Sequence, residues 1–398
     1  MSATTIGLIL LAIPIALFAY AYLVYPLILR FIAARRPSAG SVSDPPEWPS
    51  ISISLPAYNE ERSIGQTLEA LLALEYPADR RQILVISDAS TDRTDEIVRG
   101  FAGRGVELLR LPVRSGKTAA ENAAASHLRG EIVINTDATI RIPPHALKPL
   151  VRVFQDPTIG VASGRDVSVG RVDQEGNRGE SGYVGYEMWL RSLETRVGSI
   201  VGASGCFYAI RRSLVNPIFP EALSRDFASP LRAKEFGYRT VSVDEAVCYV
   251  PRTTSLRAEF RRKIRTMARG LETLWYTRSL LNPRRYGLFA WMLLSHKLCR
   301  WLVHLTLPLA LAGLAILAPE FVLAEILLIV GVVVAAVGAF ALAASETRRL
   351  PLPLAIAGFI VAVNVAALAA WWKALKGERN PIWEPTRRPG DAAVAPRS

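Results

Sequence analysis

Apolar residues gather at the two ends of this 398-residue chain, and this uneven distribution limits its fold more than any other feature. Each apolar stretch is long enough, or nearly so, to cross a bilayer, which takes about 20 apolar residues in one helix. Among acidic and basic residues, only His304 and Glu325 occur within these stretches. The sequence therefore predicts four transmembrane helices around a middle region of ordinary globular composition, within Met1–Leu29, Trp301–Ala318, Phe321–Ala344 and Pro351–Trp372.

The first apolar stretch allows two interpretations. Ala19-Tyr20-Ala21 resembles the cleavage site of a signal peptide. Against that interpretation, no basic residue precedes the stretch, whereas Arg30, Arg35 and Arg36 follow it. Because basic residues stay on the cytoplasmic side, we expect a retained anchor with its N-terminus outside and the next domain in the cytoplasm.

Near the C-terminus, the positive-inside rule gives two expectations that disagree. With the middle region inside, Arg348 and Arg349 fall in an inner turn, as the rule expects. A fourth span then places the basic tail after Trp372 outside, where the rule does not expect it. Either Tyr286–Arg300 contains a further crossing or the tail breaks the rule.

The net charge of +12 raises the question of nucleic-acid binding. Many of the basic residues flank apolar stretches, which is the pattern that an anionic inner leaflet attracts. We therefore expect membrane lipids and a diphosphate-bearing substrate as partners, and no nucleic acid. Cys206, Cys248 and Cys299 are widely spaced and lack metal-ligand spacing, which is typical of a reducing compartment.

Short β-rich runs alternate with helix-like runs between Ser50 and about Val250. This alternation predicts an α/β fold in which helices cover both faces of a parallel sheet. Ligands of such sheets bind beyond the carboxyl ends of the strands. Strands are predicted at Ile51–Leu55, Ile83–Ile86, Val106–Leu109 and Ile132–Ile134, and helices at Ser63–Leu74, Thr91–Phe101 and Thr118–Leu128.

Polar residues follow three of these predicted strands. Tyr58, Asn59 and Glu60 come after the first strand, Asp88 after the second and Asp137 after the fourth. A single aspartate at a strand end is commonly a helix cap. Two aspartates at one sheet edge, with the other polar residues beside them, instead predict a shared ligand site.

The segment Arg114–Thr118 superficially resembles a phosphate-binding P-loop. The glycine that this motif requires is absent, because Leu111 occupies its position, and the segment follows the third strand rather than the first. A Walker A loop is therefore excluded. Lys117 at a helix start near the same sheet edge still predicts a contact with a phosphate.

The segments Pro56–Glu60 (PAYNE), Ser87–Asp92 (SDASTD), Thr136–Thr139 (TDAT) and Gly202–Cys206 (GASGC) together resemble the family-2 membrane glycosyltransferases. That group contains hyaluronan, chitin, cellulose and poly-N-acetylglucosamine synthases. The resemblance runs from about Ser50 to Trp275 and implies a GT-A, Rossmann-like nucleotide-sugar domain with flanking transmembrane and interfacial helices. It also implies nucleotide binding by Pro56, Ala57, Tyr58, Glu60, Asp88, Lys117, Asp137, Arg262 and Arg265, acceptor binding by Gly202, Ser204 and Gly205, a Mg²⁺ or Mn²⁺ site at Asp137 and Thr139, and general-base catalysis by Asp226.

Two departures from the family pattern bear on these roles. Thr139 stands where the family's Asp-x-Asp metal motif has its second carboxylate, so we expect weak affinity for the free metal. Arg262–Thr266 keeps the arginine of the family's Gln-x-x-Arg-Trp motif but loses its glutamine and tryptophan. That tryptophan seats the acceptor in processive synthases. Its loss argues against processive polymerisation, unless Trp275 substitutes for it.

The segment Arg257–Trp275 predicts a basic amphipathic helix. It has one apolar stripe, and Arg261, Arg265 and Arg269 repeat every fourth residue along another face. Such a helix lies on a membrane surface or packs on a core with a solvated face, and both interpretations stay open. Tyr286–Arg300 is typical of a second interfacial segment.

These features predict a transmembrane anchor (1–30), a glycosyltransferase domain (45–255), interfacial helices (256–300), C-terminal transmembrane helices (301–375) and a tail (376–398). We expect a metal-assisted, inverting enzyme of the inner membrane, with a cytoplasmic catalytic domain. It would transfer sugar from a nucleotide sugar, expected to be a UDP-sugar, to a saccharide or lipid-linked acceptor in cell-surface polysaccharide synthesis.

Two alternatives stay open. One is a single-sugar glycolipid synthase resembling the ceramide glucosyltransferases, and the other is an inactive membrane scaffold that binds nucleotide sugars. Four spans are few to enclose a polymer channel, which leaves an oligomer or a separate exporter open as a partner.

Overall fold

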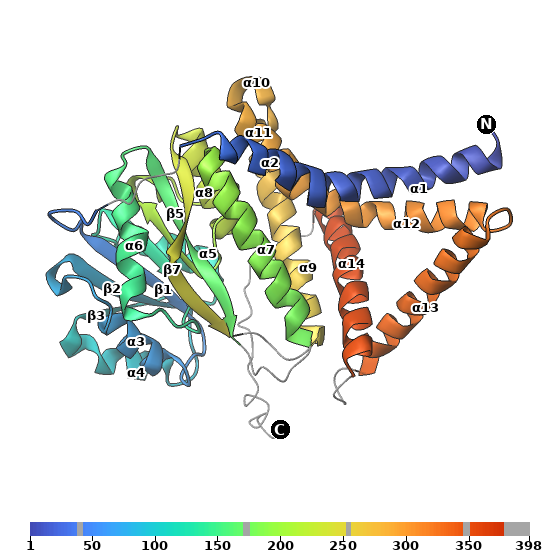
Figure 1. Cartoon of the computed structure of the whole chain (residues 1–398). Helices are drawn as coiled ribbons and strands as arrows, with labels where there is room; N and C mark the ends of the chain where they lie inside the picture. Colours follow the sequence, from blue (N-terminus) through green and yellow to red (C-terminus); the bar gives the residue numbers. More distant parts are fainter. Residues whose placement is uncertain (38–42, 170–175, 252–255, 345–350, 378–398) are drawn as a thin grey trace, which may run out of the picture.

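The computed structural model describes residues 1–37, 43–169, 176–251, 256–344 and 351–377. Arg348, Arg349 and the tail from residue 378 onward, on which the topology argument depends, lie outside the described residues. Figure 1 shows an α/β domain on one side and a group of long helices on the other.

A 7-stranded sheet forms the centre of the α/β domain, in the order β3-β2-β1-β4-β6-β5-β7. Strands β1 to β4 pair in parallel, as predicted. Strand β6 runs antiparallel to β4 and β5, so the prediction of a wholly parallel sheet is wrong beyond β4. The sequence pattern does not predict the direction of β6, because that direction depends on how the chain returns to the sheet after the 22-residue helix α7. The strands are β1 Ile51–Ala57, β2 Arg81–Ser87, β3 Val106–Arg110, β4 Ile132–Thr136, β5 Ile159–Val169, β6 Phe207–Arg211 and β7 Arg239–Pro251.

Helices cover both faces of the sheet, as the apolar strands predict. Ile83 and Val85 of β2 pack in one core with α3, α4 and α6, whereas Leu84 and Ile86 of the same strand pack in another with α5 and α8. Successive residues thus point to opposite faces. The helices of this domain are α3 Ile64–Leu72, α4 Thr94–Gly100, α5 Lys117–Ala124, α6 Leu147–Arg152, α7 Gly176–Val197 and α8 Arg225–Glu235.

Four helical segments of the described chain are long and apolar enough to cross a membrane, namely Ala3–Ala34, Leu288–Leu317, Val322–Ala344 and Ile356–Lys376. Their number agrees with the four predicted spans. From Leu288 the segment Tyr286–Arg300 continues directly into the second of these, so it forms no separate crossing. The elements are α1 Ala3–Ala19, α2 Tyr25–Ala34, α9 Leu256–Tyr276, α10 Pro283–Tyr286, α11 Leu288–Leu293, α12 Arg300–Leu317, α13 Val322–Ala344 and α14 Leu352–Lys376, with π-helical turns at Tyr20–Val24 and Leu294–Cys299.

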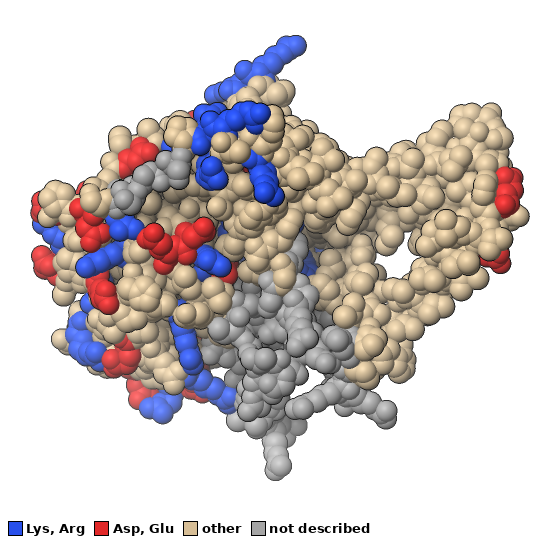
Figure 2. All heavy atoms as spheres, viewed as in Figure 1, with Lys and Arg blue, Asp and Glu red and all other residues tan. Residues whose placement is uncertain are grey.

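The long helices pack in pairs. Helix α1 lies along α12, α13 packs against α14, and α14 packs against α9 (Figure 1). Figure 2 shows charged side chains across the α/β domain, whereas the arm formed by the long helices is almost free of them on the same face. That contrast is expected of a protein in which one part is solvated and the other lies in lipid.

The α/β domain meets the long helices at a buried network of charged and polar side chains, which we call the junction network: Tyr25, Glu187, Glu194, His296 and Arg300. The ring nitrogens of His296 lie 2.7 Å from Glu194 and 3.0 Å from Glu187. Tyr25 donates a hydrogen bond to Glu194 (2.6 Å), and Arg300 donates one to Glu187 (3.0 Å). These partners allow charged residues of Tyr286–Arg300 to continue into a long apolar helix.

Candidate active site

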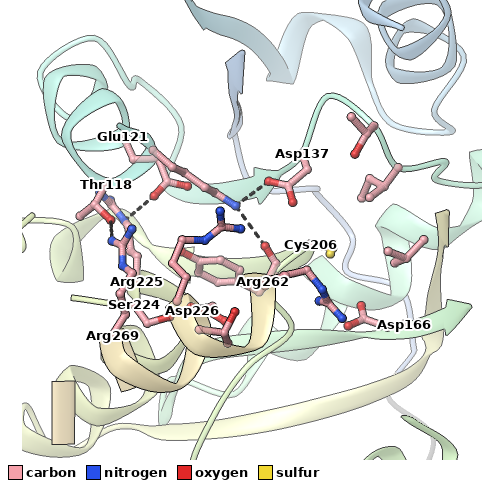
Figure 3. Close-up of a pocket in the computed structure, with 18 of the residues that line it drawn as sticks. Thr118, Glu121, Asp137, Asp166, Cys206, Ser224, Arg225, Asp226, Arg262 and Arg269 are labelled. Carbon is pink, nitrogen blue, oxygen red and sulfur yellow. Dashed lines mark hydrogen bonds and ion pairs between the residues drawn. The ribbon is translucent and has the colours of Figure 1, made fainter. Parts of the chain in front are cut away.

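A pocket of about 300 Å³ lies beyond the carboxyl end of β4, between α5, α8 and α9. Figure 3 shows Asp137 and Asp226 on opposite sides of this pocket. The predicted residues that line it are Lys117, Asp137, Thr139, Gly205, Asp226, Arg262 and Arg265.

Lys117 forms an ion pair at one end of the pocket. It is the first residue of α5 and follows Gly116, whose φ of 95° favours glycine. Its ammonium donates to Asp137 Oδ1 (2.5 Å) and to the carbonyl of Gly205 (3.1 Å). Burial lowers the pKa of Lys117, but the carboxylates of Asp137 and Glu121 outweigh burial and hold the pKa above its usual value. Lys117 is therefore a fixed positive charge beside Asp137.

Asp226 lies in the first turn of α8, where Ser224 is the N-cap residue. The Ser224 hydroxyl donates to Asp226 Oδ1 (2.6 Å), and the Ala203 amide donates to the Asp226 carbonyl (3.1 Å). A Cβ on Gly205 would lie 3.1 Å from Asp226 Oδ2, so glycine permits this close approach. The carboxylate is thus oriented by its neighbours and lines the pocket.

Helix α9 closes the pocket with Arg262, Arg265, Thr266 and Arg269. Arg269 donates to the Thr118 hydroxyl (2.7 Å) and to the Glu221 carbonyl (3.0 Å), which ties α9 to α5 and to the loop before α8. Burial lowers the pKa of Arg269. The helix therefore packs on the catalytic domain with its basic face, which differs from the solvated basic face of the second interpretation above, and it also packs against α14.

The expectation that Trp275 substitutes for the missing tryptophan of the family motif is wrong. Its side chain is 70% exposed and does not line the pocket. Trp275 is the second-last residue of α9, more than three turns after Arg262.

The ends of β1 and β2 form a second cluster next to Lys117. Asp88 accepts hydrogen bonds from the amides of Ser115 and Gly116, both at 2.8 Å. The guanidinium of Arg114 lies 4.0 Å from the ring centre of Tyr58. Strand β1 contributes through Ala57, whose carbonyl accepts the Asp88 amide (2.9 Å). This cluster brings together the predicted residues Pro56, Ala57, Tyr58, Glu60 and Asp88, which do not line the pocket itself.

Two of the three predicted acceptor residues lie behind the pocket rather than in it. Ser204 is fully buried, and its hydroxyl donates to Asp166 (2.5 Å). Gly202 is buried as well, and a Cβ there would lie 3.3 Å from the end of the Lys297 side chain. Gly205 alone of the three lines the pocket, so the turn contacts the pocket through its backbone.

The side-chain oxygens available in the pocket determine which metal ion it can bind. In the part of the chain that the structure describes, no group of three or more His, Cys, Asp or Glu side chains is placed to hold a metal ion. Asp137 and Thr139 supply one carboxylate and one hydroxyl to the pocket. Mg²⁺ commonly takes one or two carboxylates together with substrate phosphates and water. The residues present therefore fit an ion that arrives with a diphosphate.

Sequence reasoning missed several residues that line the pocket: Glu121, Asp166, Cys206, Tyr208 and Arg225. Glu121 carried a signal, because it follows Lys117 by one helical turn and so shares its face of the helix. No sequence pattern indicated Asp166 or Tyr208, because these residues are brought to the pocket by the pairing of β5 with β6.

Comparisons with known proteins identify the family that the α/β domain resembles. The family described as Glycosyl transferase family 2 matches residues 52–219. An N-acetylglucosaminyltransferase of Rhizobium sp. (strain N33) is 26% identical over 239 residues, which cover 55% of this chain and 52% of the relative. A beta-monoglucosyldiacylglycerol synthase of Synechocystis sp. (strain ATCC 27184 / PCC 6803 / Kazusa) is 27% identical over 157 residues, which cover 38% of this chain and 33% of the relative. The chain spans about half the length of the first curated relatives that it matches.

A solved structure extends the likeness beyond the catalytic domain. The mannosyltransferase PcManGT from Pyrobaculum calidifontis, in complex with GDP-Man and Mn²⁺, superposes with a TM-score of 0.72 at 25% identity, over 93% of this chain and 100% of that one. Residues 52–219, which include part of the pocket at the sheet edge, match glycosyltransferase family 2, and the α/β domain has the GT-A fold.

Proposed function

We propose that this protein is a multi-pass membrane enzyme that transfers one sugar from a nucleotide sugar to an acceptor at the inner membrane, with inversion. One observation carries the proposal: a single pocket holds an oriented carboxylate, Asp226, opposite a cationic group centred on Lys117. Transfer needs both, because the acceptor hydroxyl must lose a proton while the departing diphosphate gains charge.

Asp226 is the proposed general base. As the acceptor oxygen attacks the anomeric carbon, its proton passes to Asp226 Oδ2, since Oδ1 already accepts from Ser224. The bond from the anomeric carbon to the diphosphate breaks with its electron pair on the leaving oxygen. A single displacement of this kind inverts the anomeric centre.

The leaving diphosphate is proposed to meet Lys117, Arg262 and Arg265. These cations line the pocket and are positioned by the fold, so they would stabilise negative charge with little reorganisation during the reaction. The cluster of Tyr58, Asp88 and Arg114 adjoins Lys117 and is the proposed nucleoside site. A divalent cation held by Asp137 and Thr139 would supply further charge neutralisation to the diphosphate.

Asp137→Asn is expected to weaken metal-dependent binding of the nucleoside diphosphate, because it removes the one metal-site carboxylate. The measurement is calorimetric titration of UDP and GDP with and without Mn²⁺. In the wild-type protein Mn²⁺ should tighten binding, and in the variant this gain should shrink about tenfold or more. Equal gains in both proteins would remove Asp137 from the metal site.

Gly205→Ala is expected to lower turnover about tenfold or more, because the new Cβ would lie 3.1 Å from Asp226 Oδ2 and shift the base. The effect should fall on kcat and leave KM for the donor within a few-fold. Gly103→Ala is the matched control, since no atom lies within 4 Å of its added Cβ. Equal rates in the two variants would show that the approach of Gly205 to Asp226 is unimportant.

The glycolipid alternative is favoured over processive polymerisation by the position of Trp275. That side chain is exposed and does not line the pocket, so within the described chain α9 offers no aromatic platform there for a growing polymer. The likeness to a beta-monoglucosyldiacylglycerol synthase supports a lipid acceptor. The contact of α9 with α14 also places the pocket beside the membrane helices.

The test of the proposed function is release of nucleoside diphosphate by the purified protein in nanodiscs. A panel of UDP- and GDP-linked sugars, with total membrane lipid as acceptor, should show release with at least one donor and a product carrying a single added sugar. A ladder of oligomers would support polymerisation instead. Binding of a nucleoside diphosphate without release from any donor would support the scaffold alternative.

A further inference from the structure

Glu121 is a buried carboxylate in the active-site pocket for which the proposed reaction has no role. It lies on α5, one turn after Lys117, and its side chain is 1% exposed. It nevertheless lines the pocket, beside Arg225 (Figure 3). A buried charge of this kind is costly unless it is paired and hydrogen-bonded.

The pairing of Glu121 is incomplete. Its Oε2 lies 3.6 Å from Arg225 Nε, which is an ion pair but no hydrogen bond. Neither carboxylate oxygen accepts a hydrogen bond from any residue that the structure describes, and Arg225 Nε donates none. Burial raises the pKa of Glu121, against the opposing effect of Arg225 and Lys117. A ligand whose hydroxyl groups donated hydrogen bonds to Glu121 would lower the free-energy cost of burying this carboxylate.

The position of Glu121 indicates which ligand group would reach it. The carboxyl lies in the same pocket as Lys117 and Asp226, between which the transferred sugar must sit if the proposed reaction is right. Tyr208 also lines this pocket, and its buried hydroxyl has no hydrogen-bond partner by distance and angle among the described residues. Two carboxylate oxygens, a guanidinium N–H and a phenol can together satisfy adjacent hydroxyl groups of a sugar ring.

We propose that Glu121, with Arg225 and Tyr208, forms the subsite that reads hydroxyl groups of the transferred sugar and so sets donor specificity. The proposal rests on the proposed function, because it takes the sugar to be bound in this pocket. A polar subsite of this kind rejects a substrate that lacks the matching hydroxyl, since its buried groups are then left unpaired.

The experiment combines a change in the protein with a change in the sugar. The donor used fastest in the panel above is compared with its 3-deoxy, 4-deoxy and 6-deoxy analogues on the wild-type protein and on Glu121→Gln. In the wild type, at least one deoxy donor should lose about tenfold to a hundredfold in kcat/KM. In Glu121→Gln the same analogue should lose less than about threefold relative to the parent sugar.

Binding of the free nucleoside diphosphate separates recognition of the sugar from folding. Its Kd should stay within a few-fold in Glu121→Gln and in the control Glu107→Gln, which changes an exposed ion pair with Arg129. The control should also keep the wild-type penalties for every deoxy donor. If Glu121→Gln fails to bind the nucleotide, the deoxy penalties are measured on Glu121→Asp instead. This variant keeps the negative charge beside Arg225 but has a side chain that is one methylene shorter.

The outcomes distinguish this inference from the proposed function. Deoxy penalties that are the same in the wild type and in the folded Glu121 variant would overturn the sugar subsite alone. Absence of release from every nucleotide sugar would overturn the proposed function, and the subsite with it. A reduced penalty confined to one deoxy position supports the subsite and identifies the hydroxyl that it reads.

Discussion

Asp226→Asn is expected to lower sugar transfer by about 10²- to 10⁴-fold, the contribution typical of a positioned general base. Asparagine keeps the shape of the side chain and the hydrogen bond from the Ser224 hydroxyl, but its amide cannot take the proton of the acceptor. The loss should appear in kcat. The Kd for UDP or GDP should change by no more than a few-fold, because the nucleoside cluster at Asp88 and Arg114 is untouched. The measurements are release of nucleoside diphosphate and calorimetric titration.

Asp79→Asn is the matched control for this variant, since Asp79 is exposed on a short helical turn away from the pocket. It should keep wild-type rates. If Asp226→Asn lost nucleotide affinity as steeply as turnover, Asp226 would belong to the donor site and the base would have to be another residue. If it kept wild-type turnover, the proposed mechanism would fail.

Glu187→Gln is expected to lower the free energy of unfolding by about 3–5 kcal/mol, because it breaks a buried ion pair in the junction network. Glu187 contacts His296, Arg300 and Lys297, whose Nζ lies 3.6 Å away. Removing the carboxylate charge leaves Lys297 and Arg300 with one carboxylate fewer. Denaturant titration in detergent micelles measures the change. Glu69→Gln, which alters an exposed pair with Arg104, should change the free energy of unfolding far less, because solvent screens exposed ion pairs.

The pH dependence of this difference follows from the pKa of Glu187. Burial raises that pKa, but His296, Lys297 and Arg300 outweigh burial and hold it well below its usual value. A lowered pKa gives stability that is present above the pKa of the unfolded chain, about 4.3, and is lost as the pH falls through the folded value. The part of the difference that comes from the charge of Glu187 should therefore be fully present at pH 7 and be lost only as the pH falls below about 4.3. A difference no larger than that of Glu69→Gln at pH 7 would show that the network does not stabilise the fold.

The first half of the catalytic domain could be predicted from the sequence because its elements are local. Strands β1 to β4 are short apolar runs that end in turn residues, and the helices between them have clear apolar faces. The return of the chain through β6 could not be predicted, since its antiparallel pairing with Thr136 and its neighbours depends on contacts made after a long helix. The charges of Lys297 and Arg300 suggested an interfacial segment, and their pairing with Glu187 could not be predicted because it joins residues more than 100 positions apart.

The candidate site divides in the same way. Lys117, Asp137 and Asp226 were found because each follows or begins a recognisable element of the family pattern, and the structure brings all three to one pocket. Glu121 and Arg225 were missed because their importance is a property of the pair. Glu121 on α5 and Arg225 on α8 come together only when the two helices pack side by side. Neither the spacing of the residues nor the composition predicts that contact.

Helix α9 belongs to two environments at once. Its arginines form a wall of the pocket, while Lys263 lies 5.5 Å from the ring centre of Phe359 on α14 and Gly270 leaves room for Trp301 of α12. A change in bilayer thickness or lateral pressure that tilts α14 would therefore move cationic groups relative to Asp226. The apolar helices thus support one side of the catalytic pocket, and a fragment that ends before Leu256 would have that side open.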